Sequence, residues 1–207
     1  MQQISKKIKI ICFDLDGVLI NSLKNMNYAW KMTCLENKLK VPFFKYKKYI
    51  GLTFFDILEK LDIKKNKKKI FSDYNKFSKK KINLIKLYPF INKELKKIKK
   101  KYLIGLITSK NRKRTTRIID KFRLKFDFVY TPDDLKRGKP NPESILKIKK
   151  IFKVKSNEIL YIGDTIHDYT FSINSRINFL FANWGYGNIV NKKICKIKKL
   201  SEIYKFL

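Results

Sequence analysis

The stretch IKIICFDLDGVLINS, residues 8–22, decides the fold of this 207-residue chain. It begins with a run of apolar, mostly β-branched residues, which is typical of a buried strand. Asp14 and Asp16 stand at the end of that strand, and Gly17 lets the chain turn sharply after them. Ligands bind at the carboxyl ends of the strands in a parallel α/β sheet. The stretch therefore predicts a strand that delivers two carboxylates to a binding edge.

Two acids at this spacing have two chemical uses. They can share one divalent cation, with one acid binding through its side chain and the other through its side chain or backbone carbonyl. One of them can also attack phosphorus, because an aspartate carboxylate forms an acyl phosphate. A solvated acidic turn explains this stretch equally well, so the rest of the chain has to decide.

The charge of the chain is extreme, with 50 Lys+Arg against 17 Asp+Glu and a formal net charge of +33. Such a charge favours partners such as nucleic acid or an anionic membrane. Nearly all of it comes from lysine, however, spread along the chain and accompanied by abundant Ile, Asn, Phe and Tyr, all of which have AT-rich codons. Codon bias is therefore a competing explanation of the charge. Nucleic acid is not the expected partner, although anionic substrates should be attracted.

The remaining composition predicts a cytoplasmic monomer. Cys12, Cys34 and Cys195 are far apart and odd in number, which suits a reducing compartment. The apolar run near the N-terminus is short and broken by Asp14, so we do not expect a signal peptide. No apolar stretch approaches membrane-spanning length, so we expect no membrane partner. The lack of long apolar surface runs favours a monomer.

The pattern of hydrophobic residues divides the chain into a helical insertion and an alternating core. Residues 20–86 have no strand pattern and predict a small helical domain, with helices at Leu23–Leu39, Phe54–Leu61 and Ile70–Leu84. Residues 1–19 and 87–207 are expected to form the core. Its predicted helices are Ile91–Lys100, Arg112–Phe122, Pro142–Phe152 and Asp168–Ser175, and its later strands are Tyr102–Ile107, Phe126–Tyr130, Glu158–Ile162 and Asn178–Ala182. This alternation predicts an α/β fold with a doubly wound parallel sheet.

Polar residues collect where two further predicted strands end. Thr108 and Ser109 follow one strand just before a helix, where they can cap the helix or hold a phosphate on its N-terminus. Lys139 stands in the rigid sequence Gly138-Lys139-Pro140, where a fixed lysine would offset the charge of two approaching anions. In so lysine-rich a chain, only this Gly-Pro context distinguishes Lys139 from a surface lysine.

Two more carboxylates follow the predicted strand at residues 158–162. Asp164 comes directly after Gly163, and we expect it to face Asp14 and Asp16 and to complete an oxygen-ligand site for Mg²⁺. Asp168 could bind the metal or orient its ligands. His167 is the only histidine, and its place beside these acids is explained most simply by a side chain that points to solvent.

These motifs in this order resemble those of the haloacid dehalogenase superfamily of phosphohydrolases. The four motifs are Asp14-Leu15-Asp16-Gly17-Val18, Thr108-Ser109, Lys139 within GKPNP, and Gly163-Asp164-Thr165-x-x-Asp168. The helical insertion is similar to the cap of that family. Its position, together with Trp184-Gly185-Tyr186-Gly187, is similar to the phosphoglycolate phosphatase-like branch.

The resemblance implies a phosphoryl transfer in two steps. Asp14 would attack the substrate phosphorus and become an aspartyl phosphate. Asp16 would protonate the leaving alcohol and then take a proton from the attacking water. Mg²⁺ would be held by Asp14, the backbone carbonyl of Asp16, Asp164 and the phosphate. The phosphate oxygens would be bound by Thr108, Ser109 and Lys139, under a cap that closes to exclude water.

Three functions remain open from the sequence. The leading one is a Mg²⁺-dependent phosphatase acting on a small phosphorylated metabolite, such as a phosphoglycolate or a sugar phosphate. The second is a sugar phosphomutase similar to β-phosphoglucomutase, which would return the phosphoryl group to a sugar. The third is a non-catalytic protein that binds nucleic acid on the same fold, although a pure binder would not need all four motifs together.

Overall fold

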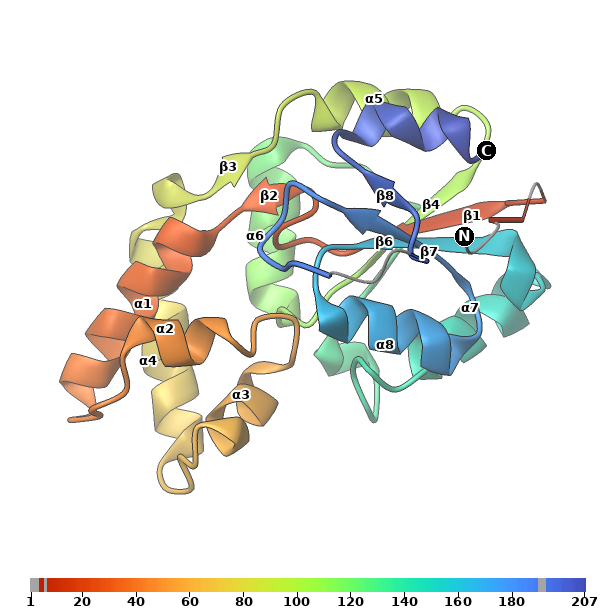
Figure 1. Ribbon diagram of the computed structural model, residues 1–207. Helices are drawn as coiled ribbons and strands as arrows, with labels where there is room; N and C mark the ends of the chain where they lie inside the picture. Colours follow the sequence, from red (N-terminus) through yellow and green to blue (C-terminus); the bar gives the residue numbers. More distant parts are fainter. Residues whose placement is uncertain (1–3, 6, 190–192) are drawn as a thin grey trace.

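The computed structural model describes residues 4–5, 7–189 and 193–207 as an α/β core with a helical domain beside it (Figure 1). Within these residues the strands are β1 Ile10–Phe13, β2 Ile20–Asn21, β3 Lys86–Leu87, β4 Leu103–Ile107, β5 Phe128–Tyr130, β6 Ile159–Gly163, β7 Asn178–Ala182 and β8 Lys196–Ile197. The helices are α1 Leu23–Glu36, α2 Phe43–Lys47, α3 Phe54–Lys60, α4 Lys67–Lys80, α5 Ile91–Ile98, α6 Arg112–Phe122, α7 Glu143–Phe152 and α8 Ile166–Ser175. Four short 3₁₀ helices lie at Ile82–Leu84, Pro132–Asp134, Ser156–Glu158 and Leu200–Lys205.

The core sheet has the strand order β5-β4-β1-β6-β7-β8, and every neighbouring pair in it is parallel. Its strands alternate with helices along the chain, so the predicted doubly wound α/β fold is confirmed. The central strand β1 lies between β4 and β6, with Phe13 level with Leu106 on one side and Ile162 on the other. The carboxyl ends of these three strands therefore meet at one edge.

The two faces of the sheet are buried in separate apolar layers. Ile11 and Phe13 of β1 belong to a cluster with α5, α6 and the helix at Leu200–Lys205. Ile10 and Cys12 point to the opposite face, into a cluster with α7 and α8. All four side chains are fully buried, as expected for a central parallel strand, which is covered on both faces.

Helices α1 to α4 enclose a third apolar cluster of their own, rich in aromatic residues, which lies apart from the sheet (Figure 1). Trp30, Tyr46, Phe54 and Tyr74 form its centre, and the rings of Phe54 and Tyr74 lie 4.7 Å apart between their centroids. We call this domain the cap. A separate apolar core explains why it can sit beside the sheet without contributing a strand to it. The predicted boundaries at residues 20 and 86 stay a prediction.

The expectation that residues 20–86 contain no strand is wrong. Ile20–Asn21 and Lys86–Leu87 pair antiparallel as a two-stranded ribbon between core and cap. Each strand has only two residues, too few for an alternating pattern to be visible in the sequence. Helix α2, Phe43–Lys47, was not predicted either, because five residues make little more than one helical turn.

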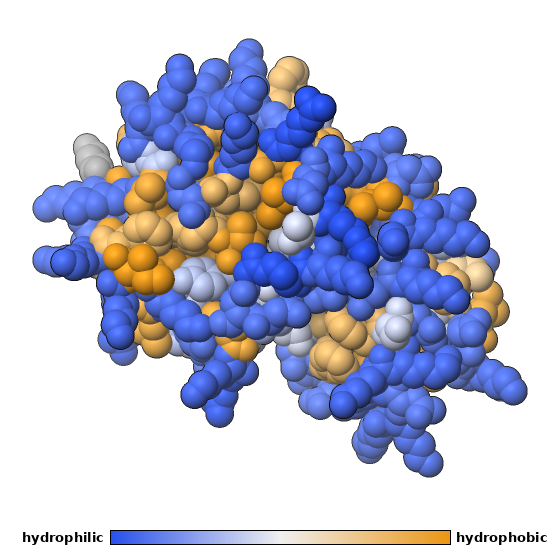
Figure 2. Space-filling model, turned by 180° about the vertical axis from the view of Figure 1, so that it is seen from behind, coloured by the Kyte–Doolittle hydropathy of each residue, from blue (hydrophilic) through white to orange (hydrophobic). Residues whose placement is uncertain are grey.

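Hydrophilic side chains cover most of the face in Figure 2, and apolar residues show among them as a broad patch. Large exposed apolar side chains such as Leu35, Phe44 and Phe90 come from separate elements. Among the described residues, no helix combines the length and the apolar character needed to cross a membrane.

Candidate active site

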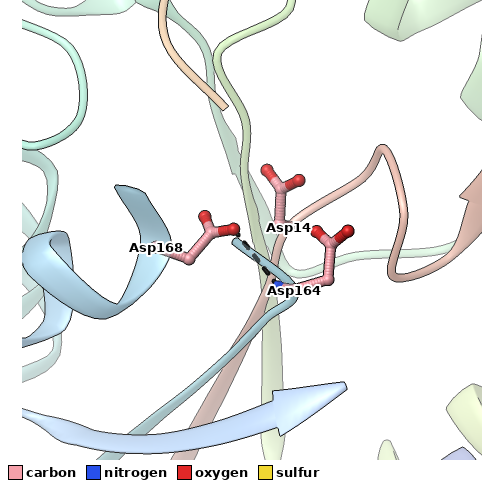
Figure 3. A group of neighbouring side chains, drawn as sticks. All are labelled: Asp14, Asp164 and Asp168. Atoms are coloured by element: carbon pink, nitrogen blue, oxygen red, sulfur yellow. Dashed lines mark hydrogen bonds between the residues drawn. The ribbon is translucent and has the colours of Figure 1, made fainter. Parts of the chain in front are cut away.

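Three buried carboxylates meet where β1 and β6 end (Figure 3). Asp14 follows β1, Asp164 follows β6, and Asp168 stands in the first turn of α8. One oxygen from each lies within 4.8 Å of the others. The parallel register of β1 and β6 causes this meeting, because Phe13 and Ile162 are paired and the acids follow almost directly. The sequence-based expectation that Asp164 faces Asp14 agrees with this arrangement.

Asp168 is held on both oxygens by the protein. Its Oδ1 accepts hydrogen bonds from Lys139 at 2.7 Å and from the Tyr161 hydroxyl at 2.9 Å. Its Oδ2 accepts from the Thr165 hydroxyl at 2.7 Å and from the backbone N–H groups of Asp164 and Thr165. Burial alone would raise the pKa of Asp168, but Lys139 and these donors lower it below its usual value. Asp168 therefore serves as a fixed anion that orients its neighbours.

Asp164 has the opposite environment. Its Oδ2 accepts from the Tyr186 backbone N–H at 2.6 Å, while its buried Oδ1 has no hydrogen-bond partner among the described residues. Burial, followed by the charges of Asp168 and Asp14, raises the pKa of Asp164 well above its usual value. An orphaned carboxylate oxygen beside two other acids is expected to have a partner, and an Mg²⁺ ion provides one. The donor set therefore fits this cation.

Lys139 connects two of the acids. Its ammonium group donates to Asp14 Oδ1 and Asp168 Oδ1 at 2.7 Å each, and to the Tyr161 hydroxyl at 2.8 Å. Burial would lower its pKa, but the charges of the two acids raise it above the usual value, so the lysine stays protonated. Burial raises the pKa of Asp14 to about 7, even though Lys139 acts to lower it. The carboxylate of Asp14 is therefore costly to keep ionised without a further cation.

Asp16 is not part of the cluster of three acids. Its Oδ2 forms an ion pair with Lys110 at 2.9 Å, and its Oδ1 accepts a hydrogen bond from the Ser22 hydroxyl. The Tyr186 hydroxyl accepts from the Ser22 backbone N–H at 2.6 Å and so fixes that serine. Both carboxylate oxygens of Asp16 thus have partners in the core, and the metal role predicted for this residue would be left to its backbone carbonyl.

A small cavity of about 40 Å³ lies over Asp14 and Asp16, between core and cap. Thr108 and Ser109, which follow β4, also line it, and their predicted binding of phosphate stays a prediction. The Ser109 hydroxyl donates to the carbonyl of Gly51 in the cap at 2.6 Å. The cap is therefore closed over the acids. The cavity has cap residues on its other walls, namely Met26, Tyr46, Ile50, Gly51, Leu52, Phe54, Ile57 and Tyr74.

Several residues of this site were not singled out from the sequence. Lys110 and Ser22 bind Asp16, Tyr161 supports Lys139, and Arg114 lines the cavity. Lys110 and Arg114 carried no signal because basic residues are everywhere in the chain. His167 is half-buried beside the cap, where a Cβ at Gly51 would lie 3.2 Å from its Cβ, and it does not line the cavity over Asp14.

Residues 11–182 match the profile of the haloacid dehalogenase-like hydrolases, a span that includes all four motifs. The chain belongs to this hydrolase family. The predicted assignment to an enzyme of the haloacid dehalogenase type is therefore confirmed.

Relatives of this haloacid dehalogenase-like hydrolase cover most of its length. It is 28% identical over 190 residues to pyrophosphatase PpaX of Bacillus mycoides (strain KBAB4), which covers 86% of this chain and 85% of the relative. It is 29% identical over 189 residues to the PpaX of Bacillus cereus (strain B4264), with 86% and 84% covered. These relatives support the phosphatase class predicted within the family.

Solved structures share the fold of this haloacid dehalogenase-like hydrolase. A haloacid dehalogenase-like family hydrolase from Streptococcus pneumoniae superposes with a TM-score of 0.83 at 22% identity and covers 98% of this chain and 99% of its own. A predicted phosphoglycolate phosphatase from Haemophilus somnus 129PT gives 0.81 at 20% identity, with 97% and 98% covered. The resemblance extends over both the core and the helical cap.

Replacing Gly17 with Ala is expected to lower both stability and activity of this hydrolase. Gly17 has φ +88°, and a Cβ there would lie 2.0 Å from Asp164 Oδ2. The strained backbone and the displaced carboxylate should together cost about 1–3 kcal/mol of unfolding free energy. Thermal unfolding and phosphate release would measure the two effects. Gly138→Ala is the control, because its Cβ would meet only a methyl group of Thr53, at 3.1 Å. Equal effects of both substitutions would contradict the prediction.

Proposed function

We propose that this hydrolase is a Mg²⁺-dependent phosphatase that hydrolyses a small phosphorylated metabolite through an aspartyl phosphate on Asp14. One observation carries the proposal: Asp14 lines a small cavity under the cap, near the unpartnered oxygen of Asp164, and Lys139 is bound to Asp14 Oδ1. A nucleophilic carboxylate, a vacant oxygen ligand and a fixed ammonium group are the three parts that phosphoryl transfer to an aspartate needs.

The residues of the chain divide the proposed reaction between them. The Asp14 carboxylate forms the new oxygen–phosphorus bond while the bond from phosphorus to the leaving alcohol breaks, and Asp16 gives that alcohol its proton. Asp16 then takes a proton from water as the water attacks phosphorus, which releases inorganic phosphate and restores Asp14. Thr108 and Ser109 are expected to bind phosphate oxygens from the wall of the same cavity.

Mg²⁺ would be held by Asp14 and Asp164, with the backbone carbonyl of Asp16 as a further ligand. When bound, it supplies charge that stabilises the phosphoryl oxygens in the transition state. Asp168 would not need to bind it directly, because both of its oxygens already accept hydrogen bonds from the protein. Its part is to fix Lys139 in place.

A small substrate is supported by the size of the cavity and by the relatives. The cavity over Asp14 is small, about 40 Å³, and the cap forms most of its walls, which favours a compact substrate. Proteins similar to this chain are described as a pyrophosphatase and as a predicted phosphoglycolate phosphatase, and both names refer to small anionic phosphates. We propose the same size class for the substrate here.

Release of inorganic phosphate from a panel of phosphorylated metabolites tests the proposal. With Mg²⁺ present, at least one small phosphate should be hydrolysed, and excess EDTA should lower the rate at least about 100-fold, because the metal provides several kcal/mol of transition-state stabilisation. Added Mg²⁺ should restore the rate. Hydrolysis that is insensitive to EDTA would contradict the metal requirement, and no hydrolysis of any compound would contradict the phosphatase.

A sugar phosphomutase is the first alternative, and it would transfer the phosphoryl group to a sugar hydroxyl in place of water. Chromatography of the products from a labelled sugar phosphate separates the two reactions. Nucleic-acid binding is the second alternative. The net charge of +33 is the only feature of the described residues that favours it. We propose a monomer that acts in the cytoplasm, which suits the buried thiols of Cys12 and Cys34.

A further inference from the structure

Arg114 is a buried cation without a counter-ion in the cavity over Asp14. Its side chain lines that cavity, and the residue is only 9% exposed. Its Nη2 has no hydrogen-bond partner, and no carboxylate in the described part of the chain forms an ion pair with it. An arginine stays protonated in proteins, so burial without an anion is costly. A bound anion in the cavity would neutralise the charge of Arg114 and give Nη2 a hydrogen-bond partner.

The guanidinium group is held in a fixed orientation. Arg114 lies in the first turn of α6, where its backbone N–H donates to the Asn111 side chain, the N-cap of that helix, at 3.3 Å. Its guanidinium carbon lies over the ring of Tyr74, 4.8 Å from the centroid. Tyr74 belongs to α4 of the cap and lines the same cavity. The contact with Tyr74 holds the guanidinium group beside the cap, while its Nη2 remains without a partner and can bind an oxygen.

Lys110 lies on the same segment but is already neutralised. It is 5% exposed and paired with Asp16 at 2.9 Å. Its ammonium group has three donors, so it can bind a further oxygen while it keeps Asp16. Burial, followed by the nearby charge of Arg114, lowers the pKa of Lys110 to about 8. The two cations therefore repel each other, and an anion between them would relieve that repulsion.

Both cations line the same cavity as Asp14 and Thr108. Thr108 follows β4 and is expected to bind the transferred phosphoryl group, and Arg114 lies in the first turn of α6 a few residues later. A residue of helix advances about 1.5 Å, so Arg114, two residues after Arg112, lies only about 3 Å along α6 from its start. A second anionic group of a compact substrate could therefore reach Arg114 within this cavity.

We propose that Arg114, assisted by Lys110, binds a second anionic group of the substrate, such as the carboxylate of a phosphorylated hydroxy acid or the second phosphate of a diphosphate. The inference rests on the proposed phosphatase and specifies its substrate class as compact phosphates with two anionic groups. The apolar cap residues Phe54 and Ile57 on the same cavity would disfavour a neutral, hydroxyl-rich sugar at this place.

Steady-state kinetics with three substrates test the subsite. 2-Phosphoglycolate and inorganic pyrophosphate carry the second anion, whereas p-nitrophenyl phosphate does not. Arg114→Gln should raise KM for the first two about 10- to 100-fold with little change in kcat, because a hydrogen-bonded charge contact is lost. It should change hydrolysis of p-nitrophenyl phosphate less than about threefold. Of 2-phosphoglycolate and pyrophosphate, the substrate whose KM rises more in Arg114→Gln carries the second anion that the subsite prefers.

Lys113→Gln is the matched control, because it removes the same charge from an exposed neighbouring position of α6. Lys113→Gln should change no KM by more than about twofold. Arg114→Lys should raise KM for 2-phosphoglycolate and pyrophosphate less than Arg114→Gln does. An equal loss on all three substrates with Arg114→Gln would overturn the proposal and leave Arg114 a support for Tyr74. An equal effect of Lys113→Gln would also overturn it, in favour of the overall charge.

Calorimetric binding separates this proposal from the proposed function. Inorganic pyrophosphate is titrated into Asp14→Asn protein, which should not turn it over, and into the Asp14→Asn/Arg114→Gln double variant. At least about tenfold weaker binding to the double variant supports the subsite even if the wild type hydrolyses no compound of the panel. Equal binding to both overturns the subsite even if the phosphatase activity is found.

Discussion

Asp14→Asn is expected to lower phosphate release by about 10⁴-fold or more, the size of effect known when an enzyme loses its nucleophile. The amide is nearly the same size as the carboxylate but cannot form the acyl phosphate. Binding of substrate should change much less, because the cavity walls from the cap remain. Initial rates with saturating substrate and Mg²⁺, compared with wild type, would measure the loss. A variant with more than about a tenth of the wild-type rate would exclude Asp14 as the nucleophile.

The same variant should keep or gain stability without metal at pH 8. Burial raises the pKa of Asp14 to about 7, so above that pH the folded protein holds a carboxylate that burial disfavours. The stability that the protonated form contributes is lost as the pH rises from the ordinary aspartate pKa of 3.8 to about 7. The amide is neutral at all pH values, which removes this cost. Thermal unfolding at pH 4 and pH 8 would show it, since the gain should be small near pH 4, where Asp14 is largely protonated in the unfolded chain too, and complete above pH 7.

Lys139→Met is expected to lower the unfolding free energy by about 3–5 kcal/mol, because it leaves buried charge without its partner. Lys139 is 3% exposed and bonds both Asp14 and Asp168, which are themselves 4% and 0% exposed. Methionine fills a similar length with an apolar chain, so the loss reports the missing charge and not a cavity. Activity should also fall at least about 100-fold, because the phosphoryl oxygens lose a fixed cation.

Urea denaturation of Lys139→Met and of Lys147→Met tests this expectation. Lys147 pairs with Glu143 at 3.2 Å on α7, but its side chain is 41% exposed, so its loss should cost less than about 1 kcal/mol. Adding Asp14→Asn to Lys139→Met should restore part of the stability, because one of the two orphaned charges is removed. A loss below about 1 kcal/mol for Lys139→Met would mean that the two acids are not ionised together in the folded protein.

The core of the fold and the centre of the site could be predicted because both depend on short sequence patterns, namely an apolar strand followed directly by a carboxylate. Asp14 and Asp164 each follow an apolar strand directly, and parallel strands bring such residues to one edge. Lys139 was identifiable only through its Gly-Pro neighbours. Helix Arg112–Phe122 and strand Asn178–Ala182 have the predicted bounds.

The remaining contacts of the site could not be predicted, since they join residues that are distant in the sequence. The ion pair of Lys110 with Asp16 joins the ends of β1 and β4, and nothing in the sequence distinguishes this lysine from its many equivalents. Arg114 acquires its environment only when α4 brings Tyr74 against α6. The ribbon of β2 and β3 pairs residues more than sixty positions apart with two residues on each side, which leaves no local periodicity.

The hydrogen bond from Ser109 to the cap has a consequence for turnover. A hydroxyl group carries one proton, and that of Ser109 is given to the Gly51 carbonyl when the cap is closed. A phosphate oxygen that accepts a hydrogen bond from the Ser109 hydroxyl would compete for it with the Gly51 carbonyl of the cap. Arrival of phosphate at Ser109 would therefore release Gly51, and departure of phosphate would return the proton to it. Competition for this one proton would thus couple the binding of phosphate to the loss of the contact between Ser109 and the cap.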